Sequence, residues 1–522
     1  MRHRRRDDMA DRRRITRRAA LGEALAGALL LAGCGGGGGA TAARSGSTLE
    51  STWSDPVGDG ELRVGPGEAL LDRTELGPRA AEVSVLATFA HITDTHVLDA
   101  SSPARVTFLD RLGPPFQSTF RPQETLTAQV LAGAVASVRS LAPALVIQGG
   151  DLIDNDQHNE LEHALAVLRG GTVRPGSGPD GYFGVQLESD PDPFYYRPDI
   201  DAPRYPGLLR AAVREFAGRG LGAPSYPVLG DHDALVAGEI VPTPLTTSLA
   251  VGDRALWELP SGLSLPPGVR AQAAASPDGP PDPGLVQSFL FQALAGPTVR
   301  VPADPARWEM TLEQVVGALG SAAGAGGVSG AAAGGVAAAA AGGRLDYTLD
   351  VGPRLRLIVL DLVRRDGGSG GLVAPGQEPW LAAQLAAAGG RWVIVVSHQP
   401  IQSSVGGEAL LALLDREPRV IAAIYGHIHR NRIVARSTPA GGYWLISTAS
   451  LIDYPQQARA LRLVATAGGG VVLETWMLDH VFPGRLGEVS RQLSFIDAQG
   501  GRPQGFAGER LDRNVRLYRR GV

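Results

Sequence analysis

Five short clusters of Asp and His residues constrain the fold of this chain more than any other feature of its sequence. Most of them directly follow a run of apolar residues, which is typical of a buried strand. Strands that end at the same edge of a sheet bring distant residues together, so the clusters predict one site at strand ends. The residues are Asp94 with His96, Asp151, Asp231, His398, and His427 with His429.

Three carboxylates and four imidazoles are enough ligands for two metal ions. Asp94 and His96 are two positions apart, so both can reach one ion from the end of a strand. Asp151 follows two glycines and can bridge two ions through its two oxygens. Mixed nitrogen and oxygen ligands suit Fe, Mn or Zn better than Ca or Mg. We expect two divalent or trivalent ions of this kind to activate a water molecule and to bind a phosphoryl group.

Apolar runs and helical periodicity predict an α/β layered fold. The strands are expected over residues 83–92, 144–147, 226–229, 355–360, 392–396, 420–425 and 443–447, and the helices over 124–141, 159–168 and 378–388. Two stretches break this rhythm, at about residues 170–224 and 234–344. The second contains residues 317–343, which are nearly all Ala and Gly and are expected to be disordered or loosely helical.

The first 33 residues have the pattern of an export signal. Residues 2–18 are strongly basic, residues 21–32 are apolar apart from Glu23, and residues 16–21 resemble a twin-arginine motif. Residues 31–34 resemble a bacterial lipobox, and Cys34 is the only cysteine. We therefore expect export by the twin-arginine translocase, lipidation of Cys34, and anchoring to the outer face of the cell membrane. The alternative is an arginine-rich disordered start with a chance cysteine.

Composition bounds the rest of the chain. Residues 35–39 are all Gly, and a Ser, Thr, Gly and Ala stretch follows, so residues 34–80 are expected to form a flexible tether. Loss of residues 1–33 would leave 40 basic and 49 acidic side chains, a formal charge of −9. A chain that is acidic overall is a poor nucleic-acid binder, so we expect no nucleic-acid partner.

The order of the clusters resembles the signature of calcineurin-like metallophosphoesterases. That signature reads Asp-x-His, Gly-Asp, Gly-Asn-His-Asp/Glu, His, and Gly-His-x-His, and the resemblance covers roughly residues 85–460. Asp346-Tyr347, Gln377 and Trp380-Leu381 resemble its middle segment. The export signal, the long inserts and residues 155–161 resemble a bacterial secreted, twin-arginine exported branch.

The resemblance implies a four-layer α-β-β-α sandwich of two mixed sheets, with a dinuclear metal site at the carboxyl ends of the strands. The metallophosphoesterase domain would span residues 81–480, with inserts at about 170–224 and 234–344. Residues 481–522 would form a C-terminal extension. The implied activity is hydrolysis of a small-molecule phosphoester, as a phosphodiesterase or phosphatase, by a hydroxide that bridges the metals.

The family's residue roles carry over position by position. Asp94, His96 and His429 would hold one ion, Asp151 would bridge, and Asp231, His398 and His427 would hold the second. His232 would assist departure of the leaving group, with Asp233 as the neighbouring carboxylate that orients it. Asn155 is expected to orient the site loop or contact the substrate.

Asp231 departs from the family pattern, which has Asn at this position. With two divalent ions, three carboxylates instead of two lower the charge of the metal core from +2 to +1. We therefore expect weaker attraction for a dianionic monoester and a relative preference for a monoanionic diester, or for a trivalent metal.

Two other functions fit the same sequence. One is a non-catalytic exported lipoprotein that keeps the fold to bind a ligand or metal, and Asp231 is the feature that favours it. The other is a surface adhesion or cell-wall module in which the inserts matter more than the site. Nucleotides, phospholipid head groups, cyclic nucleotides and wall polymers all stay open as substrates.

Overall fold

The computed structural model describes residues 46–112, 119–179, 181–190, 192–256, 268, 271, 279–280, 282–293, 296–322, 331–499 and 505–522. The expected export signal and Cys34 lie outside these residues. Across the described ranges, no helix combines the length and the apolar character that a membrane crossing needs.

One sheet has six strands in the order β11-β12-β13-β14-β16-β15. The central four strands run parallel, and β11 and β15 pair antiparallel with them at the two edges. The strands are β11 (Tyr347–Val351), β12 (Leu355–Leu360), β13 (Trp392–Ser397), β14 (Val420–Tyr425), β15 (Arg432–Arg436) and β16 (Tyr443–Ser447). β13, β14 and β16 are buried along their whole length, which explains their continuous apolar sequences.

The other sheet has seven strands in the order β3-β19-β18-β17-β4-β5-β8. Its β4, β5 and β8 are parallel, whereas β17 pairs antiparallel with both β4 and β18. The strands are β3 (Leu71–Leu76), β4 (Glu82–Ile92), β5 (Leu145–Gln148), β8 (Ser225–Pro227), β17 (Gln457–Thr466), β18 (Val471–Asp479) and β19 (Val515–Arg519).

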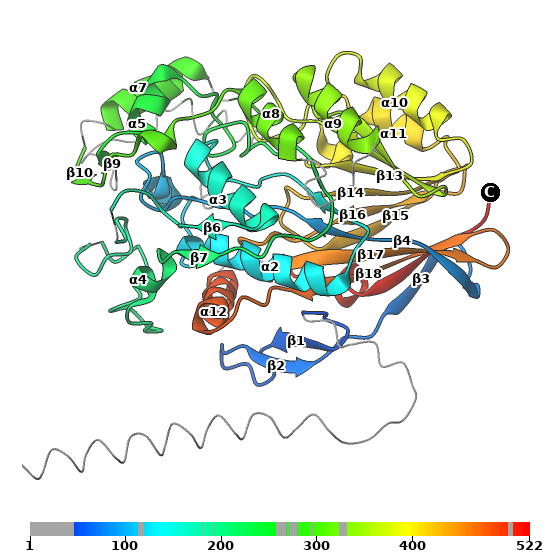
Figure 1. Cartoon of the computed structure of the whole chain (residues 1–522), viewed down its shortest axis with the longest axis horizontal. Coiled ribbons are helices and arrows are strands. Elements are labelled where there is room, and N and C mark those ends of the chain that lie inside the picture. Colours follow the sequence, from blue (N-terminus) through cyan, green and yellow to red (C-terminus); the bar gives the residue numbers. More distant parts are fainter. Residues whose placement is uncertain are drawn as a thin grey trace, which may run out of the picture. The chain divides into compact units, whose positions relative to one another are not determined.

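The two sheets pack face to face between layers of helices (Figure 1). Phe89 and Trp476 from the seven-stranded sheet share one core with Ile424 and Trp444 from the six-stranded sheet. Helices α2 (Thr127–Leu141) and α3 (His158–Arg169) cover the outer face of the seven-stranded sheet. Helices α10 (Gln377–Ala387) and α11 (Gly407–Leu414) cover the outer face of the six-stranded sheet. The predicted α-β-β-α sandwich of two mixed sheets is confirmed.

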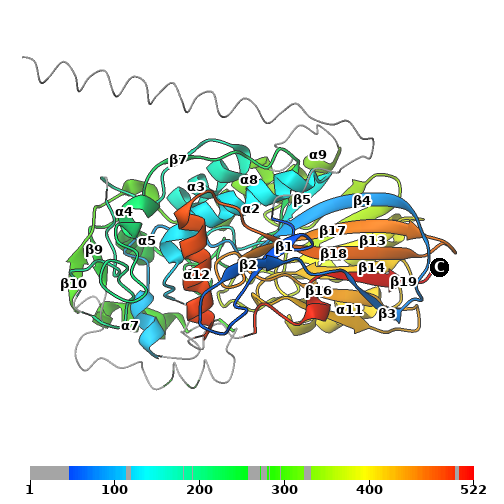
Figure 2. The same cartoon turned by 90° about the horizontal axis from the view of Figure 1, so that it is seen from below.

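The inserts form short elements, most of which gather at one end of the sheets (Figure 2), whereas the last two helices pack beside the edge strands β8 and β11. They are β6 (Thr172–Val173), α4 (Leu208–Ala212), β7 (Phe216–Ala217), α5 (Pro244–Ala250), β9 (Arg254–Leu256), α7 (Pro283–Ala293), β10 (Thr298–Arg300), α8 (Leu312–Ala322) and α9 (Ala331–Ala341). The Ala- and Gly-rich stretch supplies the end of α8 and all of α9, and Val336 of α9 is buried in the main core. A Cβ on Gly320 would lie 2.6 Å from the Cβ of Ala340, so small residues let these two helices pack closely.

The expectation of a flexible tether is wrong for residues 46–80. This part contains β1 (Ser51–Ser54), β2 (Arg63–Pro66) and β3, the last of which is an edge strand of the seven-stranded sheet. Thr48 donates to the carbonyl of Met477 at 2.8 Å, and Thr52 donates to Asp479 at 3.1 Å. Hydroxyl groups that suggested a solvated linker are used instead to fix the segment to β18.

Residues 481–499 and 505–522 are likewise part of the fold rather than an appendage. They form α12 (Arg485–Gln499), which packs beside α2, and β19, which lies between β3 and β18. Arg459 of β17 is fully buried and donates to the carbonyls of Asp512 and Arg513, which ties this segment to the centre of the sheet.

Candidate dinuclear metal site

The two sheets contribute largely different types of ligand residue, with His96 as the exception. Asp94 and His96 follow β4, Asp151 follows β5, and Asp231 lies four residues after β8, so all three carboxylates come from the seven-stranded sheet. His398 follows β13, and His427 and His429 follow β14 of the six-stranded sheet. The face-to-face packing of the sheets places the two sets opposite each other at the carboxyl ends of their strands.

The structure brings all seven predicted residues together. Their ligand atoms form two groups of four, each within 4.8 Å, and Asp151 belongs to both: Asp94, His96, Asp151 and His429 in the first, and Asp151, Asp231, His398 and His427 in the second. We call these groups position 1 and position 2.

In position 1, the Nε2 atoms of His96 and His429 lie 3.2 Å apart. His429 Nε2 also lies 3.2 Å from Asp94 Oδ1. In position 2, His398 Nε2 lies 3.1 Å from Asp151 Oδ2 and 3.3 Å from Asp231 Oδ1. His427 faces the same Asp231 oxygen with Nδ1, at 3.2 Å.

The backbone of the site is strained. Five of the seven residues have positive backbone φ angles between 43° and 64°, a region that residues other than Gly seldom adopt. They are Asp94, His96, Asp151, His427 and His429. Such strain costs on the order of 1–3 kcal/mol per residue and collects at functional sites. The chain therefore holds these side chains in place at an energetic cost.

Two glycines allow the close approach of the loops that carry the ligands. Gly150 has a φ of 97°, and a Cβ there would lie 2.3 Å from His398 Nδ1. A Cβ on Gly426 would lie 2.4 Å from Asp94 Oδ2. Any side chain at either position would clash with a predicted ligand from the opposite sheet and would separate the loops that form the site.

The donor set fits two transition-metal ions. Asp94, His398 and Asp231 are at most 1% exposed. His398 Nε2 is buried close to the carboxylates of Asp151 and Asp231, but it makes no hydrogen bond of good geometry among the described residues. A buried polar atom of this kind needs a partner, and a cation beside Asp151 and Asp231 would supply one. The mixture of imidazole and carboxylate favours Fe, Mn or Zn over Ca or Mg.

Charge balance within the site is visible in the pKa values. Burial raises the pKa of Asp94, but His429 and His398 outweigh it and hold that pKa well below its usual range. Burial lowers the pKa of His429, but Asp94 and Asp453 raise it to about 9. The carboxylates therefore favour cations in their midst, which can be protons on the imidazoles or metal ions.

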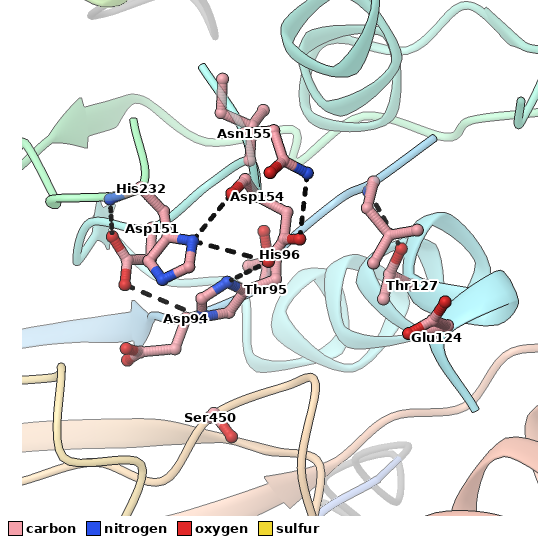
Figure 3. Close-up of polar contacts among 12 residues, drawn as sticks. Asp94, Thr95, His96, Glu124, Thr127, Asp151, Asp154, Asn155, His232 and Ser450 are labelled. Atoms are coloured by element: carbon pink, nitrogen blue, oxygen red, sulfur yellow. Dashed lines mark hydrogen bonds and ion pairs between the residues drawn. The ribbon is translucent and has the colours of Figure 1, made fainter. Parts of the chain in front are cut away.

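His232 lies beside position 1, and its ring packs edge-on to His96 with 4.5 Å between centroids (Figure 3). Its backbone N–H donates to Asp151 at 2.9 Å, and its Nδ1 lies 2.8 Å from the carbonyl of Asp154, to which it donates. The side chain is 23% exposed. Burial lowers the pKa of His232, but Asp151, Asp154 and Asp231 raise it above its ordinary value.

Two predicted roles do not match the contacts found. Asp233 was expected to orient His232, but its carboxylate accepts backbone N–H groups from Gly230, Leu152 and Ile153 instead. Asn155 is only 1% exposed, and its side chain donates to Asp154 at 3.2 Å, which agrees with the expected orientation of the site loop but not with contact to a substrate. Asp233 steadies the loop after β5, and Asn155 steadies Asp154.

Sequence reasoning missed three residues that support the ligands. Asp154 lies 2.9 Å from His96 Nδ1, and Asp453 lies 2.5 Å from His429 Nδ1. Gln399 donates to Asp231 at 3.0 Å. Asp154 follows Asp151 by three residues and Gln399 follows His398 directly, so nearness to a motif was the only signal. Asp453 had no such signal. A third group, made of His96, Asp154 and His232, is also compact enough to suggest a cation. However, the Nδ1 atoms of both histidines are already hydrogen-bonded to Asp154.

No protein-family model matches the chain, and no curated protein matches it. The solved structures that are similar to this chain include the following three. A dimetal phosphatase from Danio rerio is 14% identical, with 76% of this chain and 100% of that chain covered and a TM-score of 0.36. PhoD is 11% identical, with 84% of this chain and 82% of PhoD covered and a TM-score of 0.30. Sulfate thiohydrolase SoxB from Termus thermophilus, in complex with glycerol, is 13% identical over 81% and 61%, with a TM-score of 0.29. Function therefore has to be inferred from the side chains of the site.

Proposed function

We propose that this chain is a dinuclear metal-dependent phosphoester hydrolase of the calcineurin-like metallophosphoesterase type. The observation that carries the proposal is the sharing of Asp151 between two compact groups of four ligands. A single structural metal would need only one such group. A shared carboxylate between two groups is the arrangement that hydrolytic two-metal sites use.

Asp94, His96 and His429 would hold one ion, Asp231, His398 and His427 would hold the other, and Asp151 would contact both. When bound, the ions would supply an activated water and charge stabilisation for in-line attack at phosphorus. Asp94, Asp151 and Asp231 are buried, so little solvent screens their charges. This burial strengthens electrostatic interactions at the site.

His232 is proposed to donate a proton to the leaving oxygen. Its Nδ1 hydrogen is engaged by the carbonyl of Asp154, so Nε2 is the atom that a substrate can meet. The pKa of His232 is raised by the neighbouring carboxylates, which favours retention of the proton that a general acid has to give.

Export and lipid anchoring are also proposals. The twin-arginine-like segment and the lipobox-like segment before Cys34 support secretion by the twin-arginine translocase and attachment to the outer face of the membrane. They also support assignment to a bacterial secreted branch of the superfamily. The acidic mature charge supports a small-molecule phosphoester rather than nucleic acid as the substrate.

The competing function is a non-catalytic exported lipoprotein that uses the site to bind metal or another ligand. Asp231 favours it, because a third carboxylate lowers the positive charge that attracts a phosphate. Hydrolysis of an aryl phosphodiester and an aryl phosphomonoester, measured with and without a chelator, separates the two functions. We expect hydrolysis that chelation abolishes and added Mn²⁺ or Zn²⁺ restores. A protein that binds both ions and hydrolyses neither ester would instead be a binding protein.

A further inference from the structure

The two metal positions are supported in different ways. Both imidazoles of position 1 present Nε2 to the site and place Nδ1 on a carboxylate, which is Asp154 for His96 and Asp453 for His429. In position 2, His398 places its Nδ1 on the backbone carbonyl of Gly149 at 2.8 Å. His427 faces Asp231 with Nδ1 itself. Only position 1 therefore has two carboxylate-backed imidazoles.

Each supporting carboxylate is held in turn by a buried arginine. Arg105 donates through Nη1 to Asp154 Oδ2. Arg121 donates through Nε to Asp453 Oδ1 at 2.6 Å and through Nη2 to Oδ2 at 3.3 Å. Asp453 and Asp154 are at most 4% exposed, and both arginines are at most 8% exposed. The carboxylates are thus fixed in position and kept in their charged form.

Glu124 joins the two arms into one network. Its Oε2 accepts a hydrogen bond from Arg105 Nη2 at 2.8 Å and another from the backbone N–H of Arg121 at 3.0 Å. Glu124 begins the 3₁₀ turn η2 (Glu124–Leu126) ahead of α2 and is 1% exposed. Hydrogen bonds therefore link His96 to His429 through Asp154, Arg105, Glu124, Arg121 and Asp453. In this network Arg121 donates its backbone N–H to Glu124 and its guanidinium to Asp453.

An imidazole that donates Nδ1–H to a carboxylate is fixed in one tautomer and orientation and is a stronger ligand through Nε2. We propose that Asp453, Asp154 and the Glu124 network make position 1 the tighter of the two metal positions, so that it fills first and empties last. Asp453 and Glu124 are positioning residues in this scheme. The inference rests on the proposed function, because it assigns different affinities to the two positions of that site.

Co²⁺ titration of the chelator-stripped full chain tests this, with binding followed by calorimetry and by the visible absorption of the bound ion. We expect two classes of site, with the first ion bound at least about tenfold more tightly. Asp453→Asn should weaken the tighter class by about 10–100-fold and shift its absorption, while leaving the weaker class unchanged. His427→Ala should remove the weaker class, which assigns the classes to the positions.

Glu309→Gln is the matched control. Glu309 is also buried, but its carboxylate accepts from Thr246 and Thr247 and contacts no histidine of the site, so both classes should keep their affinities. Glu124→Gln is a second, more remote variant that tests the network if Asp453→Asn fails to fold, and it should weaken the tighter class alone.

Equal affinity of the wild-type chain for two Co²⁺ ions would overturn the inference and leave the proposed function standing. Equal weakening of both classes by Asp453→Asn, or by Glu124→Gln, would also overturn it, because that is the result of a general loss of structure. Failure of the proposed function looks different, since it would appear as two bound ions of unequal affinity with no hydrolysis of either ester.

Discussion

The two sheets divide the chemistry of the site between them. The seven-stranded sheet supplies Asp94, Asp151 and Asp231, whereas the six-stranded sheet supplies His398, His427 and His429. His96 is the one metal-ligand imidazole on the acidic side. Neither sheet carries a complete ligand set for either position, so the site exists only when the sheets are packed together. Ions bound there would act as electrostatic cross-links between the two halves of the sandwich.

Asp151→Ala should have the largest effect, because Asp151 belongs to both groups of ligand residues. We expect phosphodiester hydrolysis to fall by at least about 10³-fold, since the charge stabilisation from both ions is worth several kcal/mol. Metal content, measured by mass spectrometry, should fall below two ions per chain. Asp415→Ala, which removes an acid paired with Arg436 outside the site, should leave both measurements unchanged. Full activity in Asp151→Ala would break the idea of a shared ligand.

His232→Ala tests whether the acidic half also supplies a proton donor that is not a metal ligand. We expect a loss of about 10²-fold for an alkyl leaving group and a much smaller loss for a 4-nitrophenyl leaving group, which departs without protonation. Steady-state kinetics on the two esters give this comparison directly. His158→Ala is the control, because His158 stacks on Trp308 and is absent from both ligand groups. An equal loss for both esters would argue against a proton-donor role.

Asp231→Asn changes the charge of the acidic half without removing a ligand oxygen. The amide oxygen can still accept the hydrogen bond that Gln399 donates to Asp231. We expect monoesterase activity to rise relative to diesterase activity by roughly tenfold, because the core gains one positive charge that acts more strongly on a dianion. The ratio of kcat/KM values for the two esters is the measurement. An unchanged ratio would refute the charge explanation.

The pH dependence of the metal-free protein should show the smallest effect, as a change of a few degrees in Tm. The pKa of His429 is raised from 6.5 in the unfolded chain to about 9 in the fold. Its protonated form therefore stabilises the fold fully below about pH 6.5, and this contribution is lost as the pH rises through 9. Tm of the chelated protein should fall over this range, measured by calorimetry. The metal-loaded protein should not follow, because ions replace the protons. An equal fall in Tm for the chelated and the metal-loaded protein would contradict cross-linking of the sheets by metal ions.

Much of the fold and the ligand set could be predicted because buried parallel strands have simple sequences. The strand expected over residues 420–425 is β14 (Val420–Tyr425), and that over 392–396 is β13 (Trp392–Ser397). A strand buried on both faces needs apolar residues throughout, and a cluster directly after it marks the sheet edge. Local sequence was therefore sufficient to find the seven residues that the structure brings together.

The rest depends on pairing that local sequence does not reveal. β17 and β18 went unpredicted because they carry charged side chains such as the partly exposed Arg462 and the buried Glu474. The ion pair between these two side chains offsets the cost of burying Glu474. Residues 46–80 look like a linker until their hydroxyl groups find acceptors on β18. Asp453 and Arg121 are 332 positions apart in sequence, and only the packed structure makes them partners.

The central claim is that side chains from the two sheets hold a pair of metal ions. Anomalous diffraction from crystals of the Mn²⁺- or Zn²⁺-loaded protein tests it most directly. We predict two peaks, one among Asp94, His96 and His429 and one among Asp231, His398 and His427, with Asp151 beside both. A single peak, or none at these residues, would contradict the account.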